Sequence, residues 1–278
     1  MRRLRISAIS YLNTAPLLWD FEHGAAGSDF DISYTVPSQC AASLQAGTAD
    51  IGIIPAAAYA TIPGLAVLPG VAIASRRAVR SILLVSKVPL DDIGSVALDT
   101  SSLTSVALLQ VLFAKWWGGG RSFTPMPPDL DAMLDQHDAG LLIGDPALQV
   151  DRSRYQTYDL AEEWIRLTGK PFVFAFWAVR QAALAQAASE AALVATFQES
   201  RDHGLQPQNL KQIAAEWAPR LGITQEEVTT YLTQNIHYQL DAECIAGLQL
   251  FYRYAAECKV LLTAPTLQFL GTETPAPV

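Results

Sequence analysis

The chain is poor in charge and in cysteine for its length of 278 residues. Only 17% of its residues are charged, half are hydrophobic, and the formal net charge is −8 at pH 7. This balance excludes a disordered chain and predicts a sizeable core, in one large domain or two lobes. No basic stripe is present, so nucleic acid is not an expected partner. An acidic protein can still hold an anion through local donors such as helix N-termini.

Metal and disulfide patterns are also absent. Cys40, Cys244 and Cys258 are odd in number and widely spaced, which predicts reduced thiols rather than a disulfide framework or a Cys-x-x-Cys site. The four histidines show no metal-ligand spacing, and neither a nucleophile elbow nor a phosphate-binding loop occurs. We therefore expect no metal or other cofactor, and the sequence offers no obvious general base or nucleophile.

Long hydrophobic runs are missing as well. No stretch of eighteen apolar residues exists, so no membrane span and no membrane partner are expected. Arg2 and Arg3 are typical of the start of a secretory leader, but polar residues interrupt the segment Ile6–Asn13 that follows them. The sequence therefore predicts a cytoplasmic protein.

What is present is a strong pattern of alternating strands and helices. In Ala41–Pro55, a small-residue helix stops at Gly47, and a strand apolar on both faces, Ile51–Ile54, follows a turn. Such a strand belongs in a parallel sheet covered by helices. Ala139–Pro146 repeats this passage from apolar strand to proline in the second half of the chain. The repeated alternation predicts an α/β fold.

The order of the expected elements divides the chain into two lobes. Strands are expected at 4–9, 30–36, 51–54, 65–73, 79–86, 96–99, 139–143 and 172–179, and helices at 37–47, 106–117, 181–199, 208–217, 224–233 and 242–258. Two crossing strands, near 78–81 and 177–180, would form the hinge. Lobe 1 would then hold 1–80 and 178–278, and lobe 2 would hold 81–177. We expect the C-terminal helices to pack on the first lobe and the tail beyond Thr263 to fray.

Four loops follow strand ends and open helices: Ser10–Pro16, Pro37–Gln39, Thr100–Ser105 and Gly144–Pro146. Ligands of open α/β sheets bind at the carboxyl ends of strands, and helix N-termini suit carboxylates. The four loops together could hold a small dianion without an arginine.

Individual residues in these loops leave alternatives open. Asn13 is either a helix cap or a ligand contact, and Asp145 is either a cap or a carboxylate that accepts a ligand hydroxyl. The hydroxyl cluster at 100–105 is richer than one cap needs. Ser81 and Ser86, taken by themselves, are ordinary strand serines.

Several motifs together resemble one enzyme family. They are Ile9-Ser10-Tyr11-Leu12-Asn13-Thr14-Ala15-Pro16-Leu17, Val36–Ser38, Ala49–Pro55, Arg80–Leu84, Gly144–Ala147 and Thr168–Val173, with weaker ones at Asn235–Tyr238 and Gly247-Leu248. The matches run mainly from about Ile6 to Val179, and the set is similar to the chorismate dehydratases of the futalosine pathway of menaquinone biosynthesis.

The resemblance implies a two-lobed fold like that of type II periplasmic binding proteins, and loss of water from chorismate, a small dicarboxylate, to give 3-[(1-carboxyvinyl)oxy]benzoate. It implies that the substrate's own carboxylate removes the proton, without a cofactor. Asn13 and a hinge serine would be catalytic; we place that serine at Ser81, with Ser86 as the other register. The residues expected to bind substrate are Ser10, Tyr11, Ser38, Gln39, Ser86, Ser101, Ser102, Thr104 and Asp145.

Rival functions remain to be separated from this one. The sister enzyme that forms 1,4-dihydroxy-6-naphthoate has a similar fold but opens with a Ser-Pro-Cys-Pro-Asn-Asp type motif, unlike Ser10–Asn13 here. A second rival is a small-carboxylate-binding protein without chemistry, which is usually exported. A third is the ligand-sensing lobe of a transcription regulator, which would carry a helix-turn-helix segment ahead of the first lobe.

Overall fold

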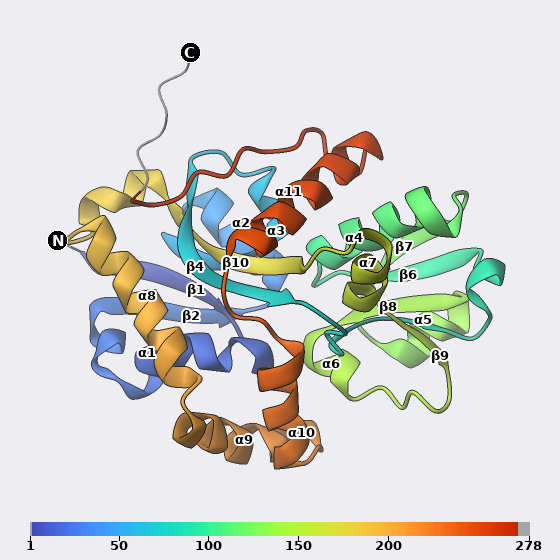
Figure 1. Ribbon diagram of the computed structural model, residues 1–278, viewed down its shortest axis with the longest axis horizontal. Helices are drawn as coiled ribbons and strands as arrows, with labels where there is room; N and C mark the ends of the chain where they lie inside the picture. Colours follow the sequence, from blue (N-terminus) through green and yellow to red (C-terminus); the bar gives the residue numbers. More distant parts are fainter. Residues whose placement is uncertain (1, 272–278) are drawn as a thin grey trace.

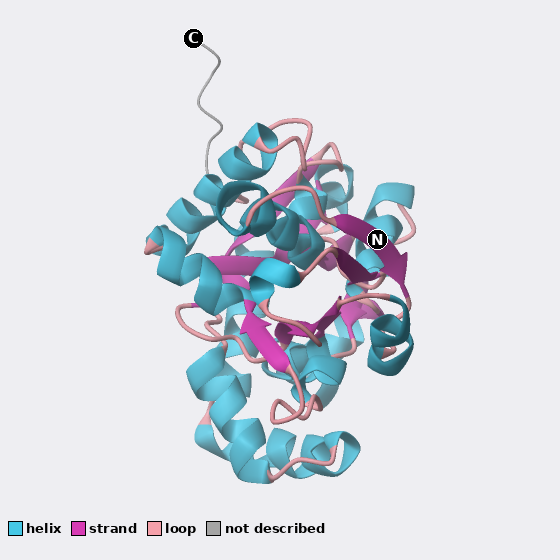
Figure 2. Cartoon of the chain, turned by 90° about the vertical axis from the view of Figure 1, so that its right-hand side faces the viewer, coloured by secondary structure: helices cyan, strands magenta, loops and turns pink. Residues whose placement is uncertain are grey.

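The computed structural model describes residues 2–271 and contains two mixed five-stranded sheets flanked by helices (Figure 1). The strand order is β2-β1-β3-β10-β4 in the first sheet and β7-β6-β8-β5-β9 in the second. A view turned by 90° shows strands in the interior and helices around them (Figure 2). This is the two-lobed α/β architecture that the sequence predicts.

The first sheet comprises β1 (Leu4–Ile9), β2 (Phe30–Thr35), β3 (Ile51–Pro55), β4 (Leu65–Ser75) and β10 (Phe172–Arg180). β1 pairs in parallel with β2 and β3, whereas β10 runs antiparallel to β3 and β4. The expectation of a parallel environment for β3 is therefore correct on one side only. Helices cover both faces of the sheet, so β3 is fully buried regardless of the direction of its neighbours.

The second sheet comprises β5 (Ile82–Ser86), β6 (Ser95–Asp99), β7 (Ser122–Met126), β8 (Ala139–Ile143) and β9 (Gln156–Asp159). β6 pairs in parallel with β7 and β8, and β5 runs antiparallel to β8 and β9. The sequence reading missed β7 and β9. Both are edge strands with exposed polar residues, and β7 contains Pro125, which only an edge position tolerates.

Helices enclose the two sheets. Those before the crossing to the second sheet are η1 (Leu12–Leu18), α1 (Trp19–His23), η2 (Ala25–Asp29), α2 (Pro37–Ala46) and α3 (Ala56–Tyr59). Those of the second sheet are η3 (Leu90–Asp92), α4 (Thr104–Leu112), η4 (Phe113–Trp117), α5 (Leu130–Gln136), α6 (Gly144–Leu148) and α7 (Leu160–Thr168). The last group is η5 (Gln181–Gln186), α8 (Glu190–Gly204), α9 (Pro207–Leu221), α10 (Gln225–Thr230), η6 (Tyr231–Asn235) and α11 (Ala242–Glu257).

The C-terminal helices pack mainly on the first sheet, as predicted. α8 contacts β4 and η1, and α11 contacts β10, while α11 also touches α4 of the second lobe. The continuous helix expected over 181–199 is wrong, because the chain breaks after η5 and α8 starts anew. Ser189 caps that new start by accepting a hydrogen bond from the Ala192 N–H.

Two short segments cross between the sheets: 76–81 on the way out and 169–171 on the way back. The expected return crossing near 177–180 is wrong, because β10 pairs along its whole length with strands of the first sheet. The outward crossing contains Arg80 at φ 64°, a left-handed conformation unusual for a non-glycine residue. The buried Asp159 carboxylate accepts the N–H groups of Val79 and Arg80 and also caps α7.

The tail beyond Thr263 is held in part, contrary to the expectation that it frays. Val67 on β4 donates its N–H to the Gln268 carbonyl and accepts the Leu270 N–H, because β4 is an edge strand with free outward groups. Residues 272–278 lie outside the described residues. No helix between residues 2 and 271 has the length and apolar character needed to cross a membrane.

Candidate active site between the two sheets

A small cavity with a volume of about 50 Å³ lies where the two lobes meet. All four predicted loops contribute to its lining: Tyr11, Asn13 and Thr14 from the first, Pro37 from the second, Ser102–Ser105 from the third, and Gly144 from the fourth. The apolar remainder is Ile9, Pro55, Ile73, Ile82, Ile143, Phe174 and Ala175. No Lys, Arg, His or Cys lines the cavity among the described residues.

Direct hydrogen bonds hold the lobes together around this cavity. The Leu12 N–H donates to Asp145 Oδ1 at 3.0 Å, and the Ser38 N–H donates to the Ser101 carbonyl at 3.0 Å. The Tyr11 hydroxyl lies 3.5 Å from Ser101 Oγ. The structure is thus a closed arrangement, and a ligand larger than a few water molecules requires the lobes to separate.

Two of the predicted binding residues already use their hydroxyls within the protein. Thr104 Oγ1 accepts the Ala57 N–H at 3.1 Å and donates to the Phe174 carbonyl at 2.9 Å. Ser101 donates to the buried Asp99 carboxylate at 2.6 Å, and burial raises the pKa of Asp99. Both residues therefore hold the start of α4 in place.

Other hydroxyls in the same segment remain free. Ser102 and Ser105 line the cavity, and neither hydroxyl has a hydrogen-bond partner within residues 2–271. The first N–H groups of an α-helix have no intrahelical partners, and no side chain caps those of α4. Free donors at a helix N-terminus favour an anionic group. Ser105 was expected only as part of its loop and not as a binding residue.

The two residues expected to be catalytic lie near each other. Asn13, on η1, lines the cavity and is half-buried. Ser81 is fully buried in the crossing segment, one residue before β5. Between them lies Tyr231, whose hydroxyl donates to Ser81 Oγ at 2.7 Å. Sequence reasoning missed Tyr231, because a tyrosine in a C-terminal helix carries no signal of its contact 150 residues away.

Gly144 allows the first and fourth loops to approach each other. It has φ 64°, and its N–H donates to the Ser81 carbonyl at 2.8 Å. A Cβ atom at this position would lie 2.6 Å from the Tyr11 ring. Both the conformation and the contact require glycine.

Asp145 joins the lobes from the next position. Its carboxylate accepts the Leu12 N–H and is not part of the cavity lining. Burial raises the pKa of Asp145 to about 6, with the Leu12 hydrogen bond acting in the opposite direction. Its predicted contact with a ligand hydroxyl stays a prediction.

Seven of the predicted residues do not line the cavity: Ser10, Ser38, Gln39, Ser81, Ser86, Ser101 and Asp145. Ser10 is exposed on a separate groove beside η1 and α9, and the exposed Gln39 accepts the Thr35 hydroxyl. Ser86 donates to the Val88 and Asp138 carbonyls at the far end of β5. The whole length of β5 separates Ser86 from the cavity, which favours Ser81 as the hinge serine.

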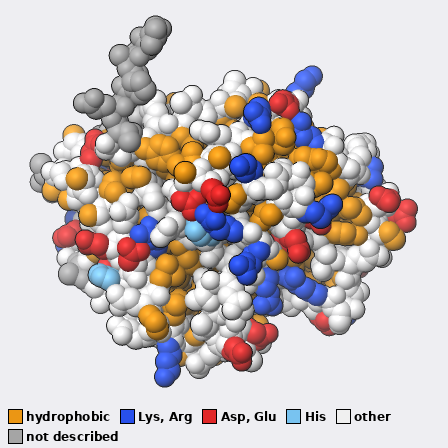
Figure 3. Space-filling model, viewed as in Figure 1, with side chains coloured by type: hydrophobic (Ala, Val, Ile, Leu, Met, Phe, Trp, Pro, Cys, Tyr) orange, Lys and Arg blue, Asp and Glu red, His pale blue; other side chains and the backbone are white. Residues whose placement is uncertain are grey.

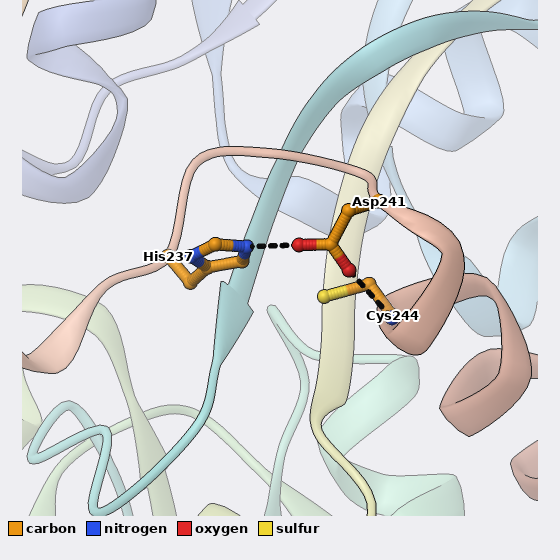
Figure 4. Close-up of side chains that lie close together, drawn as sticks. All are labelled: His237, Asp241 and Cys244. Carbon is orange, nitrogen blue, oxygen red and sulfur yellow. Dashed lines mark hydrogen bonds and ion pairs between the residues drawn. The ribbon is translucent and has the colours of Figure 1, made fainter.

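Outside the cavity, one cluster of side chains consists of residue types that can bind a metal ion. The ligand atoms of His237, Asp241 and Cys244 lie within 4.8 Å of one another (Figure 4). However, Arg76 donates to the same Asp241 oxygen as His237, at 2.7 Å, so its guanidinium already supplies the positive charge. Basic, acidic and histidine side chains lie side by side on this face of the molecule (Figure 3). The cluster ties the outward crossing to the start of α11 and fits an ion-pair network rather than a metal centre.

A cavity between two α/β lobes is typical of two-lobed binding proteins, and the comparisons with solved structures agree with this class. The periplasmic aliphatic sulphonate binding protein SsuA of Escherichia coli superposes with a TM-score of 0.64 at 18% identity, covering 100% of this chain and 97% of that one. A crystal structure of an Archaeoglobus fulgidus protein reaches 0.75 at 19% identity, covering 93% and 98%. The chain therefore has the fold of periplasmic binding proteins.

Sequence comparison identifies the family. The profile of a family described as "Menaquinone biosynthesis" matches residues 4–257, and the chain belongs to this family. A Thermus thermophilus protein named chorismate dehydratase is 30% identical over 269 residues, which cover 90% of this chain and 94% of that protein. The family predicted from the sequence motifs is confirmed.

Proposed function

We propose that the protein is a chorismate dehydratase that converts chorismate to 3-[(1-carboxyvinyl)oxy]benzoate and water. The observation that carries the proposal is that Asn13, which lines a cavity formed by four loops, and the buried Ser81 both contact Tyr231, in a chain of this family. The name of the Thermus thermophilus relative supports the choice of substrate. A biosynthetic enzyme also accords with the cytoplasmic location expected from the sequence.

The reaction requires few catalytic groups from the protein. The C3–H bond breaks, its electron pair forms the last ring double bond, and hydroxide leaves C4, so one proton and one hydroxide depart as water. Aromatisation of the ring drives the step. The enolpyruvyl carboxylate of the substrate serves as the base, which is consistent with a cavity that contains no histidine, lysine or cysteine among the described residues.

The protein would act by positioning and by excluding water. Well-oriented reacting groups gain roughly 7–11 kcal/mol over free reactants. Asn13 and Ser81 would hydrogen-bond the leaving hydroxyl or fix the side-chain carboxylate. The free hydroxyls of Ser102 and Ser105 and the N-terminus of α4 would bind the ring carboxylate. Closure through the Leu12–Asp145 and Ser38–Ser101 contacts would then shut out solvent.

A carboxylate-binding protein without catalysis is the second candidate, and the fold likeness to SsuA favours it. One experiment separates the two. The purified protein is incubated with chorismate, and the loss of chorismate and the gain of the aromatic product are followed by absorbance and chromatography. Dehydration predicts catalytic conversion that exceeds the heat-denatured control. Saturable binding with chorismate recovered intact would instead identify a binding protein.

A further inference from the structure

Tyr231 occupies an unusual position next to the two proposed catalytic residues. It begins η6, a π-helical turn that follows α10, and its side chain is only 1% exposed. Its hydroxyl donates to Ser81 Oγ at 2.7 Å. π-Helical turns within helices occur frequently at functional sites. The C-terminal region thus reaches the crossing segment through one buried hydroxyl.

The same hydroxyl also meets Asn13. Burial raises the pKa of Tyr231 well above its ordinary value, while hydrogen bonds to Ser81 and Asn13 act to lower it. Tyr231 therefore connects two residues, from η1 and from the outward crossing, that belong to different parts of the chain.

The number of protons on the Tyr231 hydroxyl determines which group donates and which group accepts in these hydrogen bonds. A tyrosine hydroxyl has one proton, and Tyr231 donates it to Ser81. Its oxygen can then act only as an acceptor toward Asn13, whose contact lowers the pKa of Tyr231. No residue within 2–271 accepts the proton of Ser81. The chain of donors runs from Asn13 through Tyr231 to Ser81, and it leaves Ser81 as a donor.

We propose that Tyr231 is a positioning residue for the dehydration. It fixes Ser81 as a hydrogen-bond donor to the substrate oxygen and holds the Asn13 amide in one orientation. The inference rests on the proposed function, because it assigns the substrate as the acceptor of the Ser81 proton.

Tyr231→Phe removes this hydroxyl and keeps the ring, so the buried packing is retained. We expect kcat to fall about three- to tenfold, the value of one typical hydrogen bond, with a smaller change in KM. Tyr238→Phe is the matched control. Tyr238 is another buried tyrosine of the same region, and its hydroxyl has no partner among the described residues. We expect wild-type kcat for that variant.

A double-mutant cycle with Ser81→Ala separates positioning from a purely structural role. In the Ser81→Ala background, Tyr231→Phe should cause a smaller loss of kcat than in the unmodified enzyme, because no serine proton is left to direct and only the contact with Asn13 remains. Equal losses in both backgrounds would overturn the inference, as would wild-type kcat for Tyr231→Phe in an enzyme that converts chorismate. If the unmodified protein binds chorismate without converting it, the proposed function fails and the inference fails with it. If the unmodified protein converts chorismate, the proposed function holds, and the variants then test the role of Tyr231 alone.

Discussion

Asp50 and Asp145 each flank a buried apolar strand and lie close to a proline in the sequence, yet the structure uses them in opposite ways. Asp50 is fully buried and bonds to the guanidinium groups of Arg2 and Arg5 and to the Arg5 N–H. Although burial opposes ionisation, these bonds hold the pKa of Asp50 well below its usual range. Asp145 has one backbone donor, Leu12, and burial raises its pKa to about 6.

Strand direction explains the difference. Asp50 precedes β3 and lies at the amino end of that strand, away from the cavity. Asp145 follows β8, at the carboxyl end, where the loops of the two lobes meet. Which end of a strand a buried carboxylate flanks therefore decides whether it contributes to stability or lies where the two lobes meet, and the nearby residue types do not.

The largest effect on stability is expected at Asp50. Asp50→Ala removes the acceptor of the Arg5 N–H and of two charged guanidinium groups and should lower the free energy of unfolding by about 2 kcal/mol. Because folding lowers the pKa of Asp50, its contribution to stability is present above about pH 4, the ordinary pKa of an aspartate, and is lost as the pH falls through the lower pKa of the folded state. Urea titration at pH 7 measures the change.

Asp31→Ala is the control for that experiment. Asp31 pairs with Arg3 at 3.8 Å on the surface, and its removal should change stability by less than ~0.5 kcal/mol. Equal effects of the two substitutions would contradict the assignment of Asp50 as a structural centre.

Asp145 should influence substrate binding rather than stability. Its charge appears as the pH rises through about 6, and that charge would repel a dianion in the neighbouring cavity. At an effective dielectric of about 20 and a separation of roughly 10 Å, each carboxylate of the dianion is repelled by about 1.7 kcal/mol, which weakens binding about fifteenfold per carboxylate. We expect the KM for chorismate to rise between pH 5 and pH 8.

Asp145→Asn keeps an acceptor for the Leu12 N–H but carries no charge. The variant should therefore show a KM that is nearly constant over the same pH range. An unchanged pH profile in the variant would show that Asp145 has no electrostatic influence on the site.

The smallest effect is expected at Arg80, whose φ of 64° is strained for a side chain with a Cβ atom. Arg80→Gly relieves the strain but gains unfolded-state entropy, so stability should change by less than ~1 kcal/mol. Arg80→Val should lower it by about 1–2 kcal/mol, because a β-branched residue resists this conformation. Thermal unfolding of both variants measures the difference, and equal melting temperatures would rule out strain at the crossing.

Much of the fold could be predicted because its central strands are strongly apolar. β1 has the predicted bounds, and β3 and β8 match closely. The return crossing was predicted near 177–180 instead of 169–171 for the same reason. The sequence of an apolar strand looks the same whether the strand spans two lobes or belongs to one lobe. Polar edge strands such as β9 carry no burial signal and were missed.

The site could be predicted to the level of loops but not of hydrogen bonds. The four loops after strand ends meet at one cavity, as the topology of α/β sheets implies. The sequence did not distinguish Thr104, whose hydroxyl is used inside the protein, from Ser102, whose hydroxyl is free. Nor did it reveal Tyr231, because its contact depends on how the C-terminal helices pack.

Turnover of chorismate by Asn13→Ala tests the central claim most directly, because Asn13 lines the cavity without a structural role in either sheet. We predict a loss of at least about a hundredfold in kcat, the size expected when a group that stabilises the transition state is removed, with an unchanged unfolding curve. Turnover near that of the unmodified protein would contradict the account, since neutral groups of this cavity would then not orient the substrate.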